Sequence, residues 1–398
     1  MSFLKKESKS EPSIIFDIGS ASINASIVIF SETHLPHVVY SLRLGLPITE
    51  HPDSDRMLTS IVSLIKDALA QLEKEGIPLL HSYHLSGKAI RHIHCVLASP
   101  WYVSQTKTLE VERKSPIVIS EDFISEITGK EEKAFEDSIA HSAYADTFDK
   151  NVVLAEQKVI HIKLNGYETK NPYGKKSSHI SFSFFSSLVS KKVTEKITEV
   201  ISSSFDKDKI KFHSFCLASF GAFTELFSEV KDFLMMDITG EVTDVSLVRG
   251  GIILETASFP SGRNFLARRI MKKMNTNAEV ALSYLSLYAN KTAEPALAVK
   301  VEQVIKEVEE EWVIYLNEVA KDLAGQGNVL PRKVFLTVDD DVAPVFLSYL
   351  KRSAYPLDTL PLNEKQTSHI VAMEKGMKAD PFIALEAVYL NKIFHNKN

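Results

Sequence analysis

One short pattern occurs twice in this chain of 398 residues, and each copy is expected to form a β-hairpin. The first copy covers residues 16–28 and the second covers residues 236–248. In both, a run of strand-forming residues ends in Asp-Ile, a turn of small residues follows, and alternating apolar positions resume. A hairpin that is repeated in this way predicts two related half-domains that close on a cleft.

The two hairpins also predict what the cleft holds. If they face each other, backbone N–H groups of both turns surround an anion. Asp17 and Asp237, one at each tip, would then hold a hydrated Mg²⁺ ion that bridges phosphates through water. Either copy alone could be an ordinary surface hairpin, but the pair favours a phosphate cleft.

The hairpins resemble the first and second phosphate loops of the actin, hexokinase and chaperone ATPase superfamily. The stretch between them is similar to the bacterial cell-division family FtsA, and the related pilus-assembly family PilM is the next most similar. The matching segments beyond the loops are 96–99, 119–123, 164–175, 217–222 and 259–266. The resemblance implies an α/β fold with actin-like, duplicated ribonuclease-H-type half-domains around a cleft and an FtsA-type inserted α+β subdomain.

The resemblance and the composition together imply a domain organisation. A disordered leader is expected over 1–12, and an inserted interaction subdomain over 84–176. The first half-domain is expected to combine 13–83, 177–230 and 375–398. The second half-domain is expected over 231–374. Its outer lobe is expected to be reduced, because the region between the helix after its third strand and the long helix over 296–323 contains only a helical stretch.

The resemblance also assigns the nucleotide site. The cofactor-binding residues that it implies are Asp17, Gly19, Ser20, Ser22, Asp237, Gly240, Thr243 and Gly262. The first loop keeps suitable residue types throughout. The second departs from the family, because Thr239 and Glu241 flank a single glycine, and Glu241 is expected to place a negative charge against a phosphate.

The adenosine site departs further. The family carries paired glycines after the strand equivalent to 334–338, whereas this chain has Asp339, Asp340 and Asp341. Three carboxylates offer no flat backbone surface for adenine and ribose. They could bind a cation, but Asp341 is expected to cap the helix that starts near Val342. ATP and Mg²⁺ are therefore expected to bind with low affinity, and the chain is expected to be at most a weak ATPase.

Composition predicts a folded cytoplasmic protein. The chain is 44% hydrophobic and 24% charged, so it can bury a large core. The formal net charge of −5 provides no basic field to recruit nucleic acid. No apolar run of about eighteen residues is present, so no segment is expected to span a bilayer. The closing helix over 382–394 is expected to pack on the sheet, so any contact with the inner face of the cell membrane is expected to run through a partner.

Two classes of function remain open. The first is an FtsA-like scaffold or filament-forming protein of cell division with a degenerate nucleotide cleft, for which self-association and division partners are expected. A PilM-like platform of a pilus or secretion assembly is the alternative within that class. The second class is an active ATPase or a small-molecule kinase of the same fold, and the acidic run at 339–341 argues against it.

Overall fold

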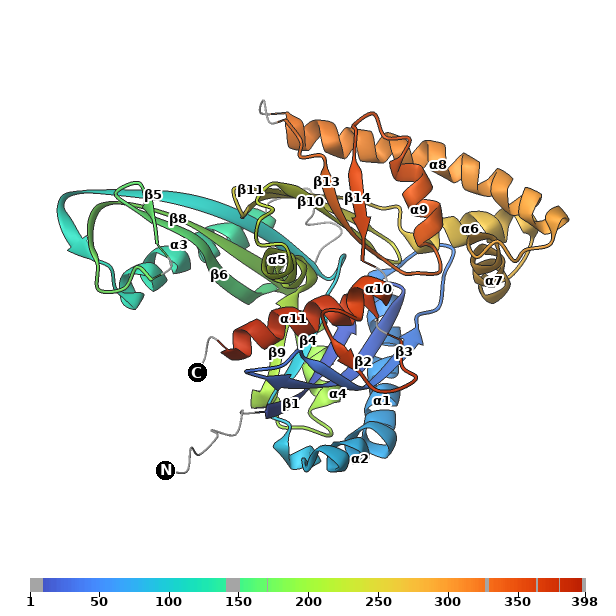
Figure 1. Ribbon diagram of the computed structural model, residues 1–398, viewed down its shortest axis with the longest axis horizontal. Helices are drawn as coiled ribbons and strands as arrows, with labels where there is room; N and C mark the ends of the chain where they lie inside the picture. The colour runs from blue at the N-terminus through green and yellow to red at the C-terminus, as the bar shows by residue number, and fades with distance from the viewer. Residues whose placement is uncertain are drawn as a thin grey trace, which may run out of the picture.

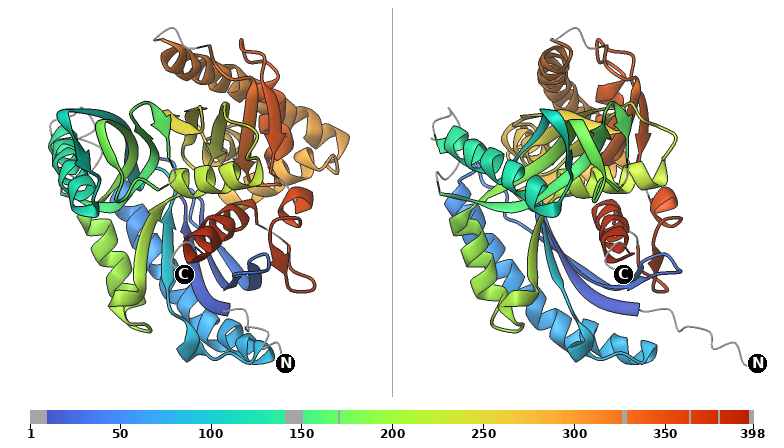
Figure 2. Two further views of the ribbon diagram at one scale, coloured as in Figure 1. Left: turned by 60° about the vertical axis from the view of Figure 1, so that its left-hand side comes forward. Right: turned by 90° about the vertical axis from the view of Figure 1, so that its left-hand side faces the viewer.

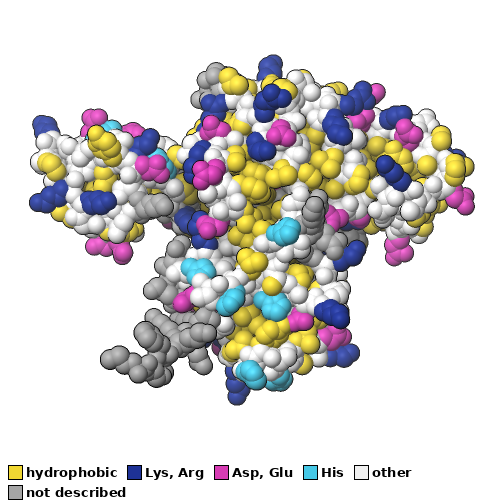
Figure 3. Space-filling model, in the orientation of Figure 1, with side chains coloured by type: hydrophobic (Ala, Val, Ile, Leu, Met, Phe, Trp, Pro, Cys, Tyr) yellow, Lys and Arg dark blue, Asp and Glu magenta, His cyan; other side chains and the backbone are white. Residues whose placement is uncertain are grey.

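The structure is a computed structural model that describes residues 10–140, 151–169, 171–325, 329–362, 364–378 and 380–395. It has three sheets, and each belongs to a separate part of the molecule (Figure 1). The first half-domain lies at the bottom of this view, the second lies above it, and the insert extends to the left. On the face shown in Figure 3, hydrophobic side chains gather near the centre, where the three parts meet.

The first sheet has the order β15-β3-β2-β1-β4-β9. Its strands are β1 (Ser10–Ile18), β2 (Ser22–Ser31), β3 (His37–Gly45), β4 (Ile93–Leu97), β9 (Ile210–Ser214) and β15 (Ala372–Met373). The helices around it are α1 (Ser54–Gln71), α4 (Lys191–Ile201), α5 (Phe215–Leu226) and α11 (Pro381–His395). Figure 2 shows α1 and α4 on one face and α11 on the other, which buries both faces of β1 and β2.

Short segments complete this half-domain. Helix α1 begins directly after Asp53, whose side chain accepts a hydrogen bond of 2.8 Å from the backbone N–H of Arg56. It continues through a π-helical turn (Leu72–Gly76) into α2 (Ile77–Leu79). Single 3₁₀ turns follow at Leu80–Tyr83, Gly87–Ala89 and Lys207–Lys209.

The second sheet repeats the topology of the first. Its order, β12-β11-β10-β13-β14, matches β3-β2-β1-β4-β9 strand for strand. The strands are β10 (Phe233–Ile238), β11 (Thr243–Arg249), β12 (Ile252–Phe259), β13 (Lys333–Val338) and β14 (Asp358–Pro361). The helices are α6 (Arg263–Met274), α7 (Ala278–Ala289), α8 (Pro295–Ala324) and α9 (Ala343–Leu350). The short helix α10 (Glu364–Thr367) follows β14 and contacts α11 of the first half-domain. The predicted duplication of actin-like half-domains is confirmed.

Helix α8 shows why the second half-domain holds together. The apolar positions of its sequence recur at three and four residues, and those at Val301, Val308 and Trp312 are buried in the core of the second sheet. The indole N–H of Trp312 donates a hydrogen bond of 3.1 Å to the carbonyl oxygen of Ser261. The long helix therefore supports the turn that precedes α6, next to the cleft.

The insert is the predicted α+β subdomain, but its limits differ from the prediction. Its sheet has the order β5-β8-β6-β7, from β5 (Tyr102–Val118), β6 (Val152–Leu164), β7 (Tyr167–Glu168) and β8 (Lys176–Ser190), with α3 (Glu121–Ala140) against it. The expected limits of 84–176 place β4 in the insert and β8 outside it, and both placements are wrong. Parallel pairing with β1 places β4 in the first sheet, and antiparallel pairing with β5 and β6 places β8 in the insert.

Two smaller boundaries also change. Ser10, Glu11 and Pro12 are paired with β2 and so belong to β1, not to a leader; the rest of the expected leader lies outside the described residues. Strand β15 pairs with β3, so the chain returns to the first half-domain before residue 375. None of the helices in the described part of the chain is long and apolar enough to cross a bilayer.

Candidate functional site

The tips of the two hairpins are opposed, as predicted, and they are in direct contact. The hydroxyl oxygens of Ser20 and Thr239 lie 3.2 Å apart. The backbone N–H of Glu241 donates a hydrogen bond of 2.9 Å to the Ser20 hydroxyl oxygen. The first loop is held from behind by Trp101, whose indole N–H donates to the carbonyl oxygen of Gly19 at 3.1 Å.

The glycines of the site approach protein atoms closely. A Cβ atom on Gly240 would lie 2.6 Å from the backbone nitrogen of Ala21, and one on Gly262 would lie 2.4 Å from the carbonyl oxygen of Thr239. Neither distance is possible for a real side chain, so both positions require glycine. In this structure that requirement comes from packing between loops of the same chain.

Several polar groups of both turns bond to other groups of the protein, whereas the buried Oδ1 atom of Asp237 has no hydrogen-bond partner among the described residues. The backbone N–H of Gly19 donates to the carbonyl oxygen of Ser22, and the N–H of Thr239 donates to that of Val242. The hydroxyl of Thr243, a predicted phosphate ligand, donates to the carbonyl oxygen of Ser261 at 2.8 Å. These groups are therefore not free to bind phosphate in this arrangement.

Very little space remains between the loops. The cavity that both hairpins line has a volume of about 20 Å³. One water molecule needs roughly 10–15 Å³ of such space, so the cavity has room for one water and none for a phosphate chain.

The sequence predicts that Glu241 places its charge against a phosphate, but Glu241 does not line this cavity. Its carboxylate accepts two hydrogen bonds from the guanidinium of Arg268, at 2.9 and 2.7 Å, and a third from the amide of Asn264 at 2.8 Å. Both partners lie on α6. A bidentate ion pair with Arg is strong and orients the carboxylate away from the first loop.

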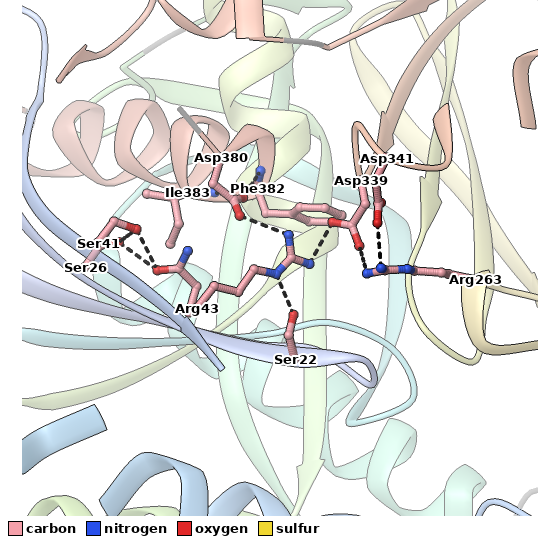
Figure 4. A network of polar contacts seen from close by, with 11 residues as sticks. Ser22, Ser26, Ser41, Arg43, Arg263, Asp339, Asp341, Asp380, Phe382 and Ile383 are labelled. Atoms are coloured by element: carbon pink, nitrogen blue, oxygen red, sulfur yellow. Dashed lines mark hydrogen bonds and ion pairs between the residues drawn. The ribbon is translucent and has the colours of Figure 1, made fainter. Parts of the chain in front are cut away.

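The acidic run after β13 also has partners that the sequence did not reveal. Asp339 forms ion pairs with Arg43 at 2.7 Å and with Arg263 at 2.9 Å, and Arg263 also binds Asp341 at 2.7 Å (Figure 4). The expectation that Asp341 caps the next helix is wrong, because the N-cap residue of α9 is Val342 and no side chain caps it. The guanidinium of Arg263 binds the Asp341 carboxylate instead.

Burial raises the pKa of both predicted metal ligands. Burial and, to a lesser extent, the nearby carboxylate of Asp380 raise the pKa of Asp17 from 3.8 to about 8, although Arg43 opposes the shift. Burial, followed by the charge of Asp244, raises the pKa of Asp237 well above its ordinary value. Among the described residues, no three His, Cys, Asp or Glu side chains are arranged to hold a metal ion. In this arrangement the loops leave no room for a phosphate chain beside Asp17.

An open groove lies elsewhere, between the insert and the first half-domain. It has a volume of about 580 Å³ and is lined consecutively by residues 153–158 of β6 and 210–213 of β9, with Tyr389 and Ile393 of α11. Consecutive residues line a groove when strand edges border it, because alternate residues of a strand point to opposite faces. Strand β9 is the last strand of its sheet, and β6 pairs with β7 only at Lys163 and Leu164.

One carboxylate joins the two walls of this groove. Glu156 of β6 accepts hydrogen bonds from the backbone N–H of Ser214 at 2.7 Å, the Ser214 hydroxyl at 2.5 Å and His213 Nδ1 at 3.2 Å. The register of β6 shifts at Ala155, between Leu154 and Glu156, and such a bulge redirects the following side chain. His213 in turn lies 3.0 Å from the ring nitrogen of His94. Sequence reasoning missed this contact, because a bulge has no local signal in the sequence.

No protein-family model matches the chain, and no curated protein matches it in sequence. Solved structures do share its fold. A chain of the PilM–PilN type IV pilus biogenesis complex has a TM-score of 0.60 and 14% identity, covering 97% of this chain and 98% of that chain. This chain has the actin-like fold of PilM.

Two further structures are similar over the whole length. A diol dehydratase-reactivating factor in nucleotide-free form has a TM-score of 0.48 and 9% identity, with 96% of this chain and 100% of that chain covered. A protein of unknown function with an actin-like ATPase fold from Bacteroides thetaiotaomicron has a TM-score of 0.43 and 10% identity, with 97% and 98% covered.

Proposed function

We propose that this protein is an assembly scaffold of the PilM or FtsA type that works without turning over ATP. The observation that carries the proposal is the direct contact between the two phosphate loops. Ser20 bonds to Thr239 and Glu241, and about 20 Å³ is left between the loops. A scaffold needs a stable surface for partners and does not need an open nucleotide cleft.

The open groove supplies a docking surface for such a scaffold. Its strand edges at 153–158 and 210–213 suit an extended segment of a partner protein, because exposed edges pair with added strands. Lys158 and Glu156 provide charges at its wall. The structurally similar chain comes from the PilM–PilN complex, which supports a pilus-assembly protein as one partner class. The resemblance of the sequence to FtsA makes a division protein the other. Self-association and a place at the inner face of the membrane, through such a partner, belong to the same proposal.

Titration calorimetry with Mg²⁺ and ATP tests the first half of the proposal. We expect no saturable heat up to about 1 mM ATP, which corresponds to roughly −4 kcal/mol of binding free energy, and no release of phosphate. Micromolar affinity with phosphate release would instead establish the ATPase alternative.

Photo-crosslinking in the host cell tests the second half. A benzophenone analogue of phenylalanine at Phe212, inside the groove, is compared with the same residue at Leu79, an exposed position on α2. We expect a defined segment of one pilus or division protein to crosslink at 212 and not at 79. A synthetic peptide of that segment should then bind the purified wild type and not Phe212→Glu. Equal crosslinking at both positions would refute docking in the groove.

A further inference from the structure

A chain of five alternating charges crosses the cleft beside the hairpins. It runs from Asp380 at the start of α11, through Arg43 of β3, to Asp339, Arg263 and Asp341 (Figure 4). The first two residues belong to the first half-domain and the last three to the second. The contact of 2.7 Å between Arg43 and Asp339 is therefore an ion pair that joins the two halves.

Each side of this ion pair is held by its own half-domain. On the first side, Arg43 Nε donates to the Ser22 hydroxyl at 2.8 Å, and Nη1 donates to Asp380 at 3.2 Å. The guanidinium carbon also lies 6.0 Å from the centre of the Phe382 ring. An arginine held at three points loses little further freedom when it binds a fourth group.

On the second side, Arg263 donates to Asp339 at 2.9 Å and so fixes the carboxylate that Arg43 meets. Asp339 is 8% exposed. The Arg43 side chain is 34% exposed and both residues border a space of about 490 Å³, so the ion pair is partly shielded and is screened less by salt than a pair at the surface. Both partners of the ion pair are thus held in place by their own half-domains.

We infer that Arg43 is a cross-cleft clasp, which holds the two half-domains closed in the place where an actin-like protein would use a bound cation and phosphates. The clasp acts within the chain, so it needs no ligand. This inference is independent of what docks in the groove and of which assembly the protein serves.

Hydrogen–deuterium exchange of the backbone amides of loops 19–22 and 239–242 tests the clasp. In Arg43→Met, we expect exchange in both loops to accelerate at least about tenfold, because the loops open when the halves separate. The control is Arg352→Met, which removes the guanidinium from the buried Glu309, 2.6 Å away, within the second half-domain and away from the loops. Exchange in the loops should be unchanged in that control.

Equal exchange rates in the loops of the two variants would overturn the inference. If Arg43→Met does not fold, Arg43→Lys serves the same test, because a lysine keeps the charge but cannot hold Ser22, Asp380 and Asp339 at once. We expect intermediate acceleration in Arg43→Lys, and wild-type rates in that variant would equally overturn the clasp.

Discussion

The cleft between the half-domains and the groove beside the insert differ in how their polar groups are used. In the cleft, the loops bond to each other, the acids are buried, and about 20 Å³ is left between the hairpins. In the groove, two strand edges border a space of about 580 Å³. The space between the phosphate loops is thus filled. Beside the loops the cleft stays open, where Arg43, Arg263 and Asp339 border a space of about 490 Å³, and the junction made by the inserted subdomain is open as well. A shared fold therefore does not determine where a protein binds its partners.

The largest effect is expected from a substitution that adds a side chain at Gly240, where the two loops are in contact. Gly240→Val places a side chain against the backbone of Ala21, so we expect a loss of about 3 kcal/mol in the free energy of unfolding, at the upper end for overpacking. Denaturant unfolding measures it. Gly129→Val in α3 is the matched control, because a Cβ there meets no atom within 4 Å, and it should change stability by less than about 0.5 kcal/mol. Equal effects would show that the loops are not in contact and that the cleft is open like the groove.

A pH-dependent effect of intermediate size is expected at Asp17. Since burial raises its pKa from 3.8 to about 8, the folded protein keeps a proton that the unfolded chain releases between these values. The folded state binds more protons in that window, so the contribution of Asp17 to the free energy of unfolding falls as pH rises from about 4 to about 8.

Asp17→Asn should remove this dependence. At pH 7.5 we expect the variant to be more stable than the wild type, and near pH 4 the difference should vanish. Urea unfolding across this pH range measures both. A destabilised variant at pH 7.5 would indicate an ionised Asp17 with a cationic partner, which is the arrangement of an active phosphate cleft.

A smaller effect is expected at Glu156, which joins the insert to the first half-domain. Glu156→Gln weakens the charged hydrogen bonds to Ser214 and His213, and we expect a loss of about 1.5 kcal/mol. Glu110→Gln is the control on the same sheet, because its carboxylate is 54% exposed and pairs with His179 at the surface. Thermal unfolding compares the two. If both variants lose the same stability, Glu156 does not anchor the insert, and the walls of the groove are held less firmly than those of the cleft.

Some features follow from the sequence because their signals are local. The repeated hairpins, the stripe of α8 and the Asp53 cap each depend on residues within a few positions of one another, and all three are present. The actin-like duplication followed from the hairpins and from the resemblance that they carry. The limits of the insert did not follow, because sheet membership depends on the pairing partner, and β4 and β8 pair with strands outside their predicted domains.

The sequence by itself determined which elements form and that two similar halves face each other. Only the tertiary structure decided what fills the space between them. Arg43 and Asp339 lie in different half-domains and far apart in the sequence, so no periodicity or motif reports their contact. The sequence predicts Asp17 and Asp237 as metal ligands, whereas only the fold shows that burial raises the pKa of both, because the pKa of a carboxyl group depends on the solvent and the charges around it.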